Sequence, residues 1–529
     1  MLLVGRFSAR QRQQPTVTQS MMFSAIISWL SGLACKTKHE NVHGHDQTTE
    51  TDDIYPLHFI DQASMVRSSI ICYNFRFNHV LDAQALHASL LQLLQIGDWR
   101  KLGGRLRLNK EGKLEIHVSR HVKSKYDKVR FSHVQLDVAI GEHPLGARLP
   151  TETGSSPSIH QGFQPFRSFS HPSDMPAKLL VKHWLTSDEP ILCLHITSFT
   201  DATLVALSHP HTLADAMGMA GIMTAWSHVL SGRPDLVVPV ASPRHDVLSL
   251  VGEESDDRAQ DRFILEHTLM KGVSMALFVV RVVWDLLTRR EVPVHHVFLP
   301  AKFVSHLRQQ ARDELVQAPF LSDGDLITAY FSTMIIKSRL STGTKSRPAT
   351  IFNVFNLRGR IDDTFDPDQA YVQNMMLPCT TLLSAEETRS VTFPKVALGL
   401  RKSITTQTVD SQVRALVRIA KTSGATPMFV TSPASMVMAC TNWSKAQFSR
   451  VVDFSAAAVP QHRGTPDADT KSDAPGKPAM FWGSEIASIV PPRDLTIIYG
   501  KNATGDYWIL GNYRPETWDL IRKDFAAFD

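Results

Sequence analysis

The chain has 529 residues, of which 43% are hydrophobic, and its formal net charge is only +5. A chain of this length can bury more than one hydrophobic core, so two lobes are expected. The small charge, without a long basic stretch interleaved with aromatic residues, argues against nucleic acid as a partner. The five cysteines are scattered and form no Cys-x2-Cys pair, which predicts neither a metal site nor disulfides and favours a reducing compartment.

Residues 1–53 are predicted to be an N-terminal extension. Residues 1–39 contain no Asp or Glu but several basic residues, and residues 22–35 are mostly apolar yet too few to span a bilayer. This composition is typical of a transit peptide or of a short interfacial helix. Residues 36–53 are polar and predicted to be disordered. We therefore expect a cytoplasmic protein, with mitochondrial or membrane-surface targeting by residues 1–39 as the alternative.

The first lobe is predicted to span residues 54–245. Ser69–Phe77 is expected to be a strand and Asp82–Gln95 a helix, because its apolar residues recur every three or four positions. Leu114–Val118 is expected to be a second strand. The Pro-, Ser- and Gly-rich stretch at 149–175 predicts a surface loop.

Two His-x3-Asp patterns occur in this lobe, one at His133–Asp137 and one at His211–Asp215. Random placement of the residues gives roughly one or two such matches, so only context separates them. Between residues 131 and 140 apolar and polar residues alternate, which predicts a half-buried strand with His133 and Asp137 on its solvated face.

The context of His211 is different. Leu204–Leu207 predicts a buried strand and Ala214–Leu230 a helix, so His211 is expected at a strand-to-helix junction, where functional side chains are commonly displayed. An imidazole there can act as a general base near neutral pH. His209 has no aspartate four positions later and is interpreted as a neighbour at the strand end.

Residues 246–298 are predicted to connect the lobes, beginning with an exposed acidic run near 253–261. The apolar segment Met275–Leu287 is interrupted by Arg281 and Asp285, so we expect a packed helix rather than a membrane span, with membrane-surface contact as the alternative. The second lobe is predicted at 299–529, with a polar, solvated insertion near 461–475.

Six short motifs follow one another in an order that resembles the BAHD acyltransferases, especially the fungal members akin to trichothecene acetyltransferases. The anchor is His211-Thr-Leu-Ala-Asp215. The other motifs, in chain order, are Pro56–Asp61, Gly103–Leu106, Asp323–Ala329, Phe355–Arg360 and Tyr371–Asn374. The resemblance covers roughly residues 55–525 and rests on this collinear order, because each motif alone is weak.

The chain departs from the family pattern at one place. The family's Asp-Phe-Gly-Trp-Gly-Lys-Pro motif is represented by Val452-Asp-Phe-Ser455, and Gly476-Lys-Pro478 follows only after the polar insertion. The motif is therefore interrupted, and its loop geometry is in doubt.

The resemblance implies a two-lobed, chloramphenicol-acetyltransferase-like α/β fold with mixed sheets and a tunnel between the lobes. It implies a monomeric acyl-CoA-dependent O-acyltransferase that moves an acyl group, expected to be acetyl, from CoA to a hydroxyl of a secondary metabolite. His211 would be the general base and Asp215 would pair with Arg358 to hold the histidine loop. Thr441, Asn442 and Ser444 lie where the family often places an oxyanion-stabilising group. No permanently bound cofactor, no metal and no transmembrane segment are expected, and the residues that bind CoA are not specified.

Two alternatives stay open at this point. One is a non-catalytic family member that uses the same fold for binding or regulation, for which the interrupted motif is the best support. The other is a condensation-type, amide-forming enzyme, which usually carries His-His-x3-Asp-Gly. Here position 210 is proline and position 216 is alanine, and no carrier domain is present in the sequence.

Overall fold

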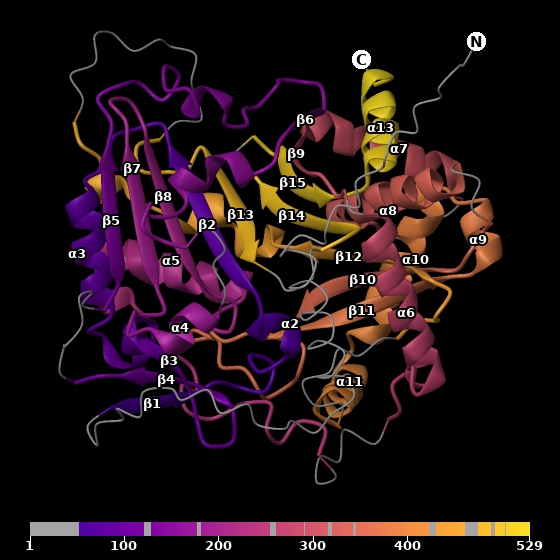
Figure 1. Cartoon of the computed structure of the whole chain (residues 1–529), viewed down its shortest axis with the longest axis horizontal. Helices are drawn as coiled ribbons and strands as arrows, with labels where there is room; N and C mark the ends of the chain where they lie inside the picture. The colour runs from indigo at the N-terminus through magenta and orange to yellow at the C-terminus, as the bar shows by residue number, and fades with distance from the viewer. Residues whose placement is uncertain are drawn as a thin grey trace, which may run out of the picture.

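The structure is a computed structural model that describes residues 52–120, 128–176, 181–253, 261–289, 291–315, 320–341, 345–422, 430–460, 474–487, 492–502 and 504–528. Nearly all of the expected extension (1–53) and most of the expected insertion near 461–475 lie outside these residues. The described chain is an α/β protein with two large mixed sheets, as expected. Figure 1 shows these sheets side by side, with the early part of the chain at the left and the later part at the right.

The first large sheet has five strands in the order β13-β2-β8-β7-β5. Its strands are β2 (Ile70–Phe77), β5 (Arg130–Gln135), β7 (Cys193–Ser198), β8 (Thr203–Pro210) and β13 (Met480–Ala487). Helices α3 (Ala83–Leu93) and α5 (Ala216–Leu230) cover one face, where Trp226 of α5 donates its indole hydrogen to the carbonyl of Leu86 on α3. Every residue of β8 is buried, which explains why its central part, Leu204–Leu207, is continuously apolar rather than alternating.

A small sheet extends the same half of the molecule. It contains β1 (Asp53–Pro56), β4 (Leu114–Val118) and β3 (Arg105–Leu108). The short helix α2 (Ser64–Arg67) precedes β2 in the chain, and the short helix α4 (Lys182–Thr186) packs against β3. The predicted strand Leu114–Val118 and the helix predicted from Asp82 are confirmed, and Asp82 caps α3 by accepting hydrogen bonds from two backbone amides.

The second large sheet has seven strands in the order β11-β10-β12-β14-β15-β9-β6. Its strands are β6 (Ser158–Gln161), β9 (Val294–Leu299), β10 (Ala349–Asn356), β11 (Met376–Leu383), β12 (Met436–Asn442), β14 (Leu495–Lys501) and β15 (Tyr507–Asn512). β10, β12 and β14 pair in parallel, and the other pairs are antiparallel.

Helices surround this second sheet. They are α7 (Ala301–Glu314), α8 (Asp323–Ser341), α9 (Ala385–Arg389), α10 (Phe393–Gln407), α11 (Asp410–Thr422) and α13 (Pro515–Ala526). The central helix α8 is buried on almost all sides, so its sequence shows little amphipathic pattern. The remaining helix of this half, α12 (Phe448–Val451), packs toward the first half beside α5.

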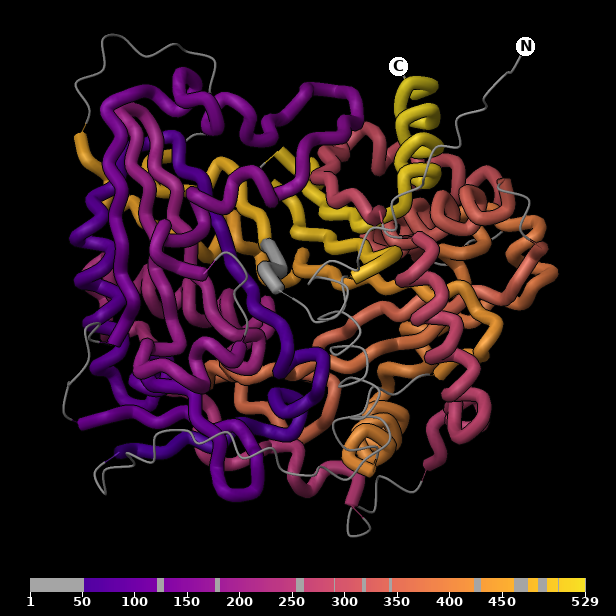
Figure 2. Tube along the Cα trace, viewed as in Figure 1, coloured from indigo at the N-terminus to yellow at the C-terminus, as the bar shows by residue number. Residues whose placement is uncertain are grey.

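Each half contributes one strand to the sheet of the other. β6, from the early part of the chain, pairs with β9 in the second sheet, and β13, from the late part, pairs with β2 in the first sheet. In Figure 2 the early chain crosses the top of the molecule to reach this position. The division at residues 54–245 and 299–529 stays a prediction, but these two strands show that the sheets do not follow it.

The prediction of a surface loop at 149–175 was wrong. This stretch contains β6 and a 3₁₀ helix at Gln164–Phe169, and Phe166 and Phe169 are almost completely buried. Its Pro, Ser and Gly residues suggested a loop, but the aromatic residues between them pack into the core of the first half. Composition averaged over the stretch concealed these few apolar residues.

The prediction of a packed helix near Met275–Leu287 was also wrong in part. A helix does form there, α6 (Val273–Thr288), but only Phe278 and Leu286 are fully buried. The helix lies on the surface with much of its apolar side chain area exposed. Within the ranges given above, none of the helices is both long and apolar enough to cross a membrane.

Candidate active site

His211 lies in the short connection between β8 and α5, at the expected strand-to-helix junction. β8 ends at Pro210 and α5 begins at Ala216. The backbone amide of His211 donates to the carbonyl of Ser69, at 2.8 Å, which attaches the connection to the start of β2. A second backbone hydrogen bond, from Leu213 to Pro210, closes a tight turn. The backbone around the histidine is therefore held from two directions.

The imidazole of His211 is half-buried, and its Nδ1 lies in the interior without a hydrogen-bond partner among the described residues. Burial lowers the pKa of His211 below its usual value, and the nearby charge of Asp215 offsets this only in part. The ring is consequently neutral at physiological pH, the state in which it can accept a proton.

Asp215 is the N-cap of α5 and directs its carboxylate into a set of donors. Its Oδ1 accepts from the amide of Gly218, at 2.8 Å. Its Oδ2 accepts from the Arg358 guanidinium, at 2.9 Å, and from the amide of Met375, at 2.8 Å. Two of these donors are backbone amides and the third is a side chain of the same protein, so the carboxylate uses its hydrogen bonds to hold the turn.

Arg358 follows β10 and connects this turn to a second segment of chain. Its guanidinium donates to the carbonyls of Tyr371 and Gln373 and to the side chain of Asn356, in addition to Asp215. Residues 371–375 also approach α5 closely, because a Cβ at Gly218 would lie 2.0 Å from the carbonyl oxygen of Val372. The small residues after Asp215 therefore allow this segment to pack against the helix.

Asn374 contacts the catalytic candidate from the same segment. Its Nδ2 donates to the carbonyl of His211 and to Oδ1 of Asp61, both at 2.8 Å. Asp61 is buried and also accepts from the amides of Asn374 and His58. Burial raises the pKa of Asp61 to about 7, against the lowering effect of these hydrogen bonds. Sequence reasoning used Asp61 and Asn374 only as landmarks and assigned them no place at the site; their positions in two of the collinear motifs were the available signal.

Thr441, Asn442 and Ser444 lie at the end of β12 and the turn after it. The Trp443 indole donates to Thr441, Asn442 accepts from the amide of Ser444, and Oγ of Ser444 is buried with no partner in the described part of the chain. Among the residues that the structure describes, no hydrogen bond joins any of the three to His211. Aromatic contacts connect this turn to the end of β8: the ring of Trp443 packs against Tyr73, and Tyr73 stacks on His209, two residues before His211.

The other two histidines considered in the sequence have different environments. His209 is completely buried, its Nδ1 is 2.8 Å from the carbonyl oxygen of Pro210, and burial lowers its pKa to about 4. His133 is exposed on β5, where its Nε2 is 3.0 Å from the hydroxyl of Ser198. Asp137 lies beyond the end of β5 and is exposed as well.

The interrupted Asp-Phe motif is brought together in space. The amide of Phe454 donates to the carbonyl of Gly476, at 2.9 Å, and Lys477 forms an ion pair with Asp453, at 3.1 Å. Phe454 also packs against Trp226 of α5, with ring centroids 4.6 Å apart. The chain on both sides of the insertion therefore meets beside the helix that follows His211.

Within the described ranges, no three His, Cys, Asp or Glu side chains lie close enough together to hold a metal ion. The polar groups around His211 are instead backbone amides, an arginine and an asparagine. Such a set holds the loop in place, and the neutral imidazole of His211 is in the state that can accept a proton.

The fold has solved counterparts. The structure of TRI101 of F. sporotrichioides, complexed with coenzyme A and T-2, superposes with a TM-score of 0.60 at 15% sequence identity. The match covers 90% of this chain and 97% of that one. The protein therefore shares the α/β fold of that structure.

Sequence comparison identifies the family. The model of the Transferase family matches residues 162–455. The acetyltransferase BOT5 of Botryotinia fuckeliana is 44% identical over 514 residues, which are 92% of this chain and 93% of that protein. The O-acetyltransferase PaAT-2 of Phomopsis amygdali is 33% identical over 490 residues, covering 90% and 98%. The chain belongs to the Transferase family, the BAHD acyltransferases, and is an acyltransferase.

One similar protein is named as a regulator rather than as an enzyme. The protein calD of Penicillium decumbens, named a transcriptional regulator, is 32% identical over 490 residues, covering 90% of this chain and 95% of that protein.

Proposed function

We propose that the protein transfers an acetyl group from acetyl-CoA to a hydroxyl group of a secondary metabolite, with His211 as the general base. The observation that carries the proposal is the neutral, half-buried imidazole of His211 in a turn fixed by Asp215, Arg358 and Asn374. The names of the two fungal relatives, acetyltransferase and O-acetyltransferase, support the acetyl group and the hydroxyl acceptor.

The chemistry requires a base at the acceptor, because a neutral hydroxyl is a poor nucleophile. In the proposed reaction the imidazole of His211 removes the hydroxyl proton as the oxygen attacks the thioester carbonyl. The tetrahedral intermediate collapses with breakage of the carbon–sulfur bond, and the imidazolium returns its proton to the CoA thiolate. General base catalysis contributes about 10²–10⁴-fold, and positioning of the two substrates supplies the remainder.

Asp215 and Arg358 act on the reaction through the position of His211. Their ion pair is largely shielded from solvent, and the same arginine fixes the carbonyls of Tyr371 and Gln373. For the oxyanion we favour Ser444 over its neighbours Thr441 and Asn442, because its Oγ is buried without a partner among the described residues. A hydroxyl donor directed at the developing negative charge would stabilise the intermediate.

The test is a matched pair of histidine variants assayed for release of free CoA. Purified protein is incubated with several acyl-CoAs and an extract of fungal metabolites, and the products are followed by mass. We expect acetyl-CoA to support turnover, His211→Ala to lower it by about 10²-fold or more, and His133→Ala to leave it unchanged. Full turnover by a folded His211→Ala variant would exclude this histidine as the base.

A second candidate function is regulation without catalysis, which the name of the calD relative favours. The two candidates differ in one measurable property. A regulator would release no CoA from any acyl-CoA in the same extract, even though the wild-type protein is folded and His211 is intact.

A further inference from the structure

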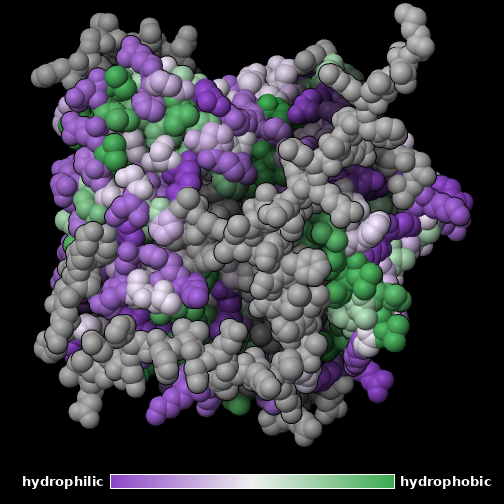
Figure 3. All heavy atoms as spheres, viewed as in Figure 1, coloured by the Kyte–Doolittle hydropathy of each residue, from purple (hydrophilic) through white to green (hydrophobic). Residues whose placement is uncertain are grey.

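The outer face of α6 carries an apolar stripe that faces solvent. We call this the α6 stripe, and it consists of Val273, Leu277, Val280, Trp284 and Leu287. The steps of four and three residues place these side chains on one face of a helix, and each is between 46% and 76% exposed. In Figure 3 the hydrophobic atoms gather in a patch at the right of the molecule, over α6.

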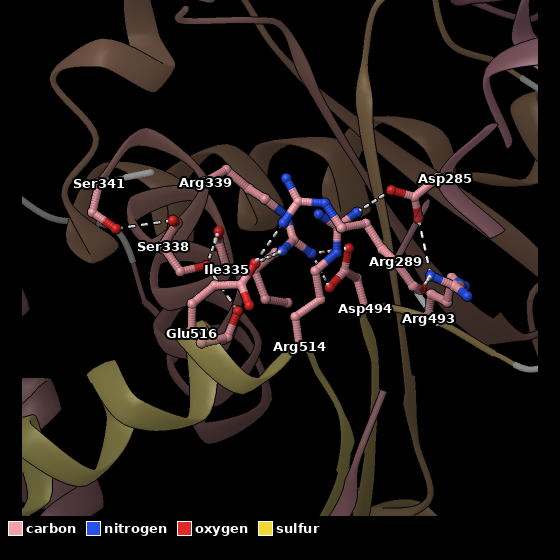
Figure 4. A network of polar contacts seen from close by, with 11 residues as sticks. Asp285, Arg289, Ile335, Ser338, Arg339, Ser341, Arg493, Asp494, Arg514 and Glu516 are labelled. Atoms are coloured by element: carbon pink, nitrogen blue, oxygen red, sulfur yellow. Dashed lines mark hydrogen bonds and ion pairs between the residues drawn. The ribbon is translucent and has the colours of Figure 1, made fainter. Parts of the chain in front are cut away.

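Both charged residues of the helix turn away from the stripe. Arg281 donates to the carbonyl of Pro433, at 2.6 Å. Asp285 accepts from Arg493, at 3.1 Å, and from Arg514, and Figure 4 shows it directed toward these arginines. The exposed face of α6 therefore has no charge along its length.

A wider ion-pair network fixes the carboxyl end of α6 to the body of the protein. Arg339 of α8 binds Asp494, with both distances 2.7 Å, and also lies 3.4 Å from Glu516 of α13. Arg289, directly after α6, lies 3.8 Å from the same glutamate, and Figure 4 draws the whole cluster. Because the helix is anchored by these contacts, the outward direction of the stripe is a fixed property of the fold.

The size of the stripe distinguishes between possible partners. Its five side chains expose on the order of 500 Å² of apolar surface, which is at the upper end of the patches on ordinary monomers. A stable interface with a second copy needs about 800 Å² from each partner. The stripe alone is therefore too small for a dimer but sufficient for partial insertion into a lipid surface.

The charges at the ends of the helix point to the kind of lipid. Lys271 precedes α6 and is exposed, and Arg289 follows it and is half-exposed. Basic residues at the ends of an apolar face, with a tryptophan in that face, are typical of helices that lie in the interface of a bilayer containing anionic lipids. Residues 1–39, which contain basic residues and no acidic ones, would be attracted to the same surface.

We propose that the α6 stripe docks the protein on the surface of membranes that contain anionic lipids. The helix lies parallel to the bilayer, with Trp284 at the level of the headgroups and the basic ends against lipid phosphates. This docking is independent of the acyl transfer proposed above, since none of its residues contacts the turn that holds His211 among the described interactions.

Tryptophan fluorescence can test the contact directly. Seven described tryptophans are buried, whereas Trp284 is 68% exposed, and Trp29 lies outside the described residues. The full-length protein is mixed with vesicles of phosphatidylcholine and phosphatidylserine whose acyl chains carry bromine, which quenches tryptophans at the interface. We expect quenching that falls in Trp284→Phe, persists in Trp29→Phe and weakens at high salt.

Charge substitutions supply the matched control. Leu277→Asp with Val280→Asp should weaken binding to these vesicles about tenfold or more, whereas Leu250→Asp, at another exposed apolar position, should not change it. CoA release with a water-soluble acceptor should be equal in all of these variants. Absence of vesicle binding, loss of quenching only in Trp29→Phe, or a dimer that dissociates in the double variant would each overturn the proposal.

Discussion

At the scale of single residues, Asp215 determines two properties of His211. Its carboxylate holds the turn through three donors, and its charge raises the pKa that burial lowers. The pairing with Arg358 links residues 143 positions apart. Neither spacing nor periodicity contains that information, so it came from the family resemblance alone.

The pH dependence of turnover should report the pKa of His211. The base is active when neutral, so kcat/KM rises with pH and levels off above the pKa of the free enzyme. Because burial lowers that pKa, we expect the plateau to extend below pH 6.5, the usual pKa of histidine. In Asp215→Asn the opposing charge is lost, so the rise should move to still lower pH, measured from kcat/KM across pH 4–8. A rise centred above pH 7 would contradict the structure.

Removal of Arg358 should destabilise the protein. Arg358→Ala leaves the carboxylate of Asp215 buried without its charge partner, and such a loss costs about 3–5 kcal/mol. Unfolding in urea measures the change. The control is Arg233→Ala, which breaks an ion pair at the surface and should leave the unfolding midpoint unchanged. Equal effects of the two substitutions would show that the Asp215 pair has no special role.

At the scale of elements, regular patterns were predicted well and mixed patterns poorly. The helix beginning near Asp82 and the strand at Leu114–Val118 have clear periodicity and form as expected. The predictions for residues 149–175 and for α6 were wrong for the same reason. Whether a side chain is buried depends on which part of the protein packs against it, and a local sequence pattern does not contain that information. Val134 and Val138 likewise alternate with polar residues in the sequence but are exposed, and β5 ends at Gln135, so Val138 lies beyond the strand.

The meeting of the two parts of the interrupted motif depends on a glycine. Gly476 has φ +76°, and a Cβ there would lie 2.0 Å from the amide nitrogen of Ser455. Gly476→Ala should therefore lower the free energy of unfolding by more than about 1 kcal/mol. Gly112→Ala is the matched control, because its φ is +73° but no atom lies within 4 Å. Both substitutions strain the backbone, but only Gly476→Ala also places a methyl group against Ser455. The difference between the thermal unfolding midpoints of the two variants therefore measures the cost of that steric clash.

At the scale of the whole molecule, the two halves exchange strands. β13 supplies the edge of the first sheet through its pairing with β2, and β6 supplies the edge of the second through its pairing with β9. Exchanged strands make each sheet dependent on both halves of the chain. Strand exchange could not be predicted from the sequence, because pairing between strands so distant in the chain leaves no periodic signal.

This exchange predicts how fragments of the chain behave. A cut between residues 253 and 261 separates β2 from β13 and β6 from β9 without removing any residue of either sheet. The first fragment would expose the edge of β2 and the buried phenylalanines of the first core, and such edges aggregate. We therefore expect each fragment alone to be insoluble, whereas the two expressed together should purify as one particle with the turnover of the intact chain. A soluble, monomeric first fragment with slow amide exchange in β2 and β8 would show that the halves fold independently and that the exchanged strands add little to their stability.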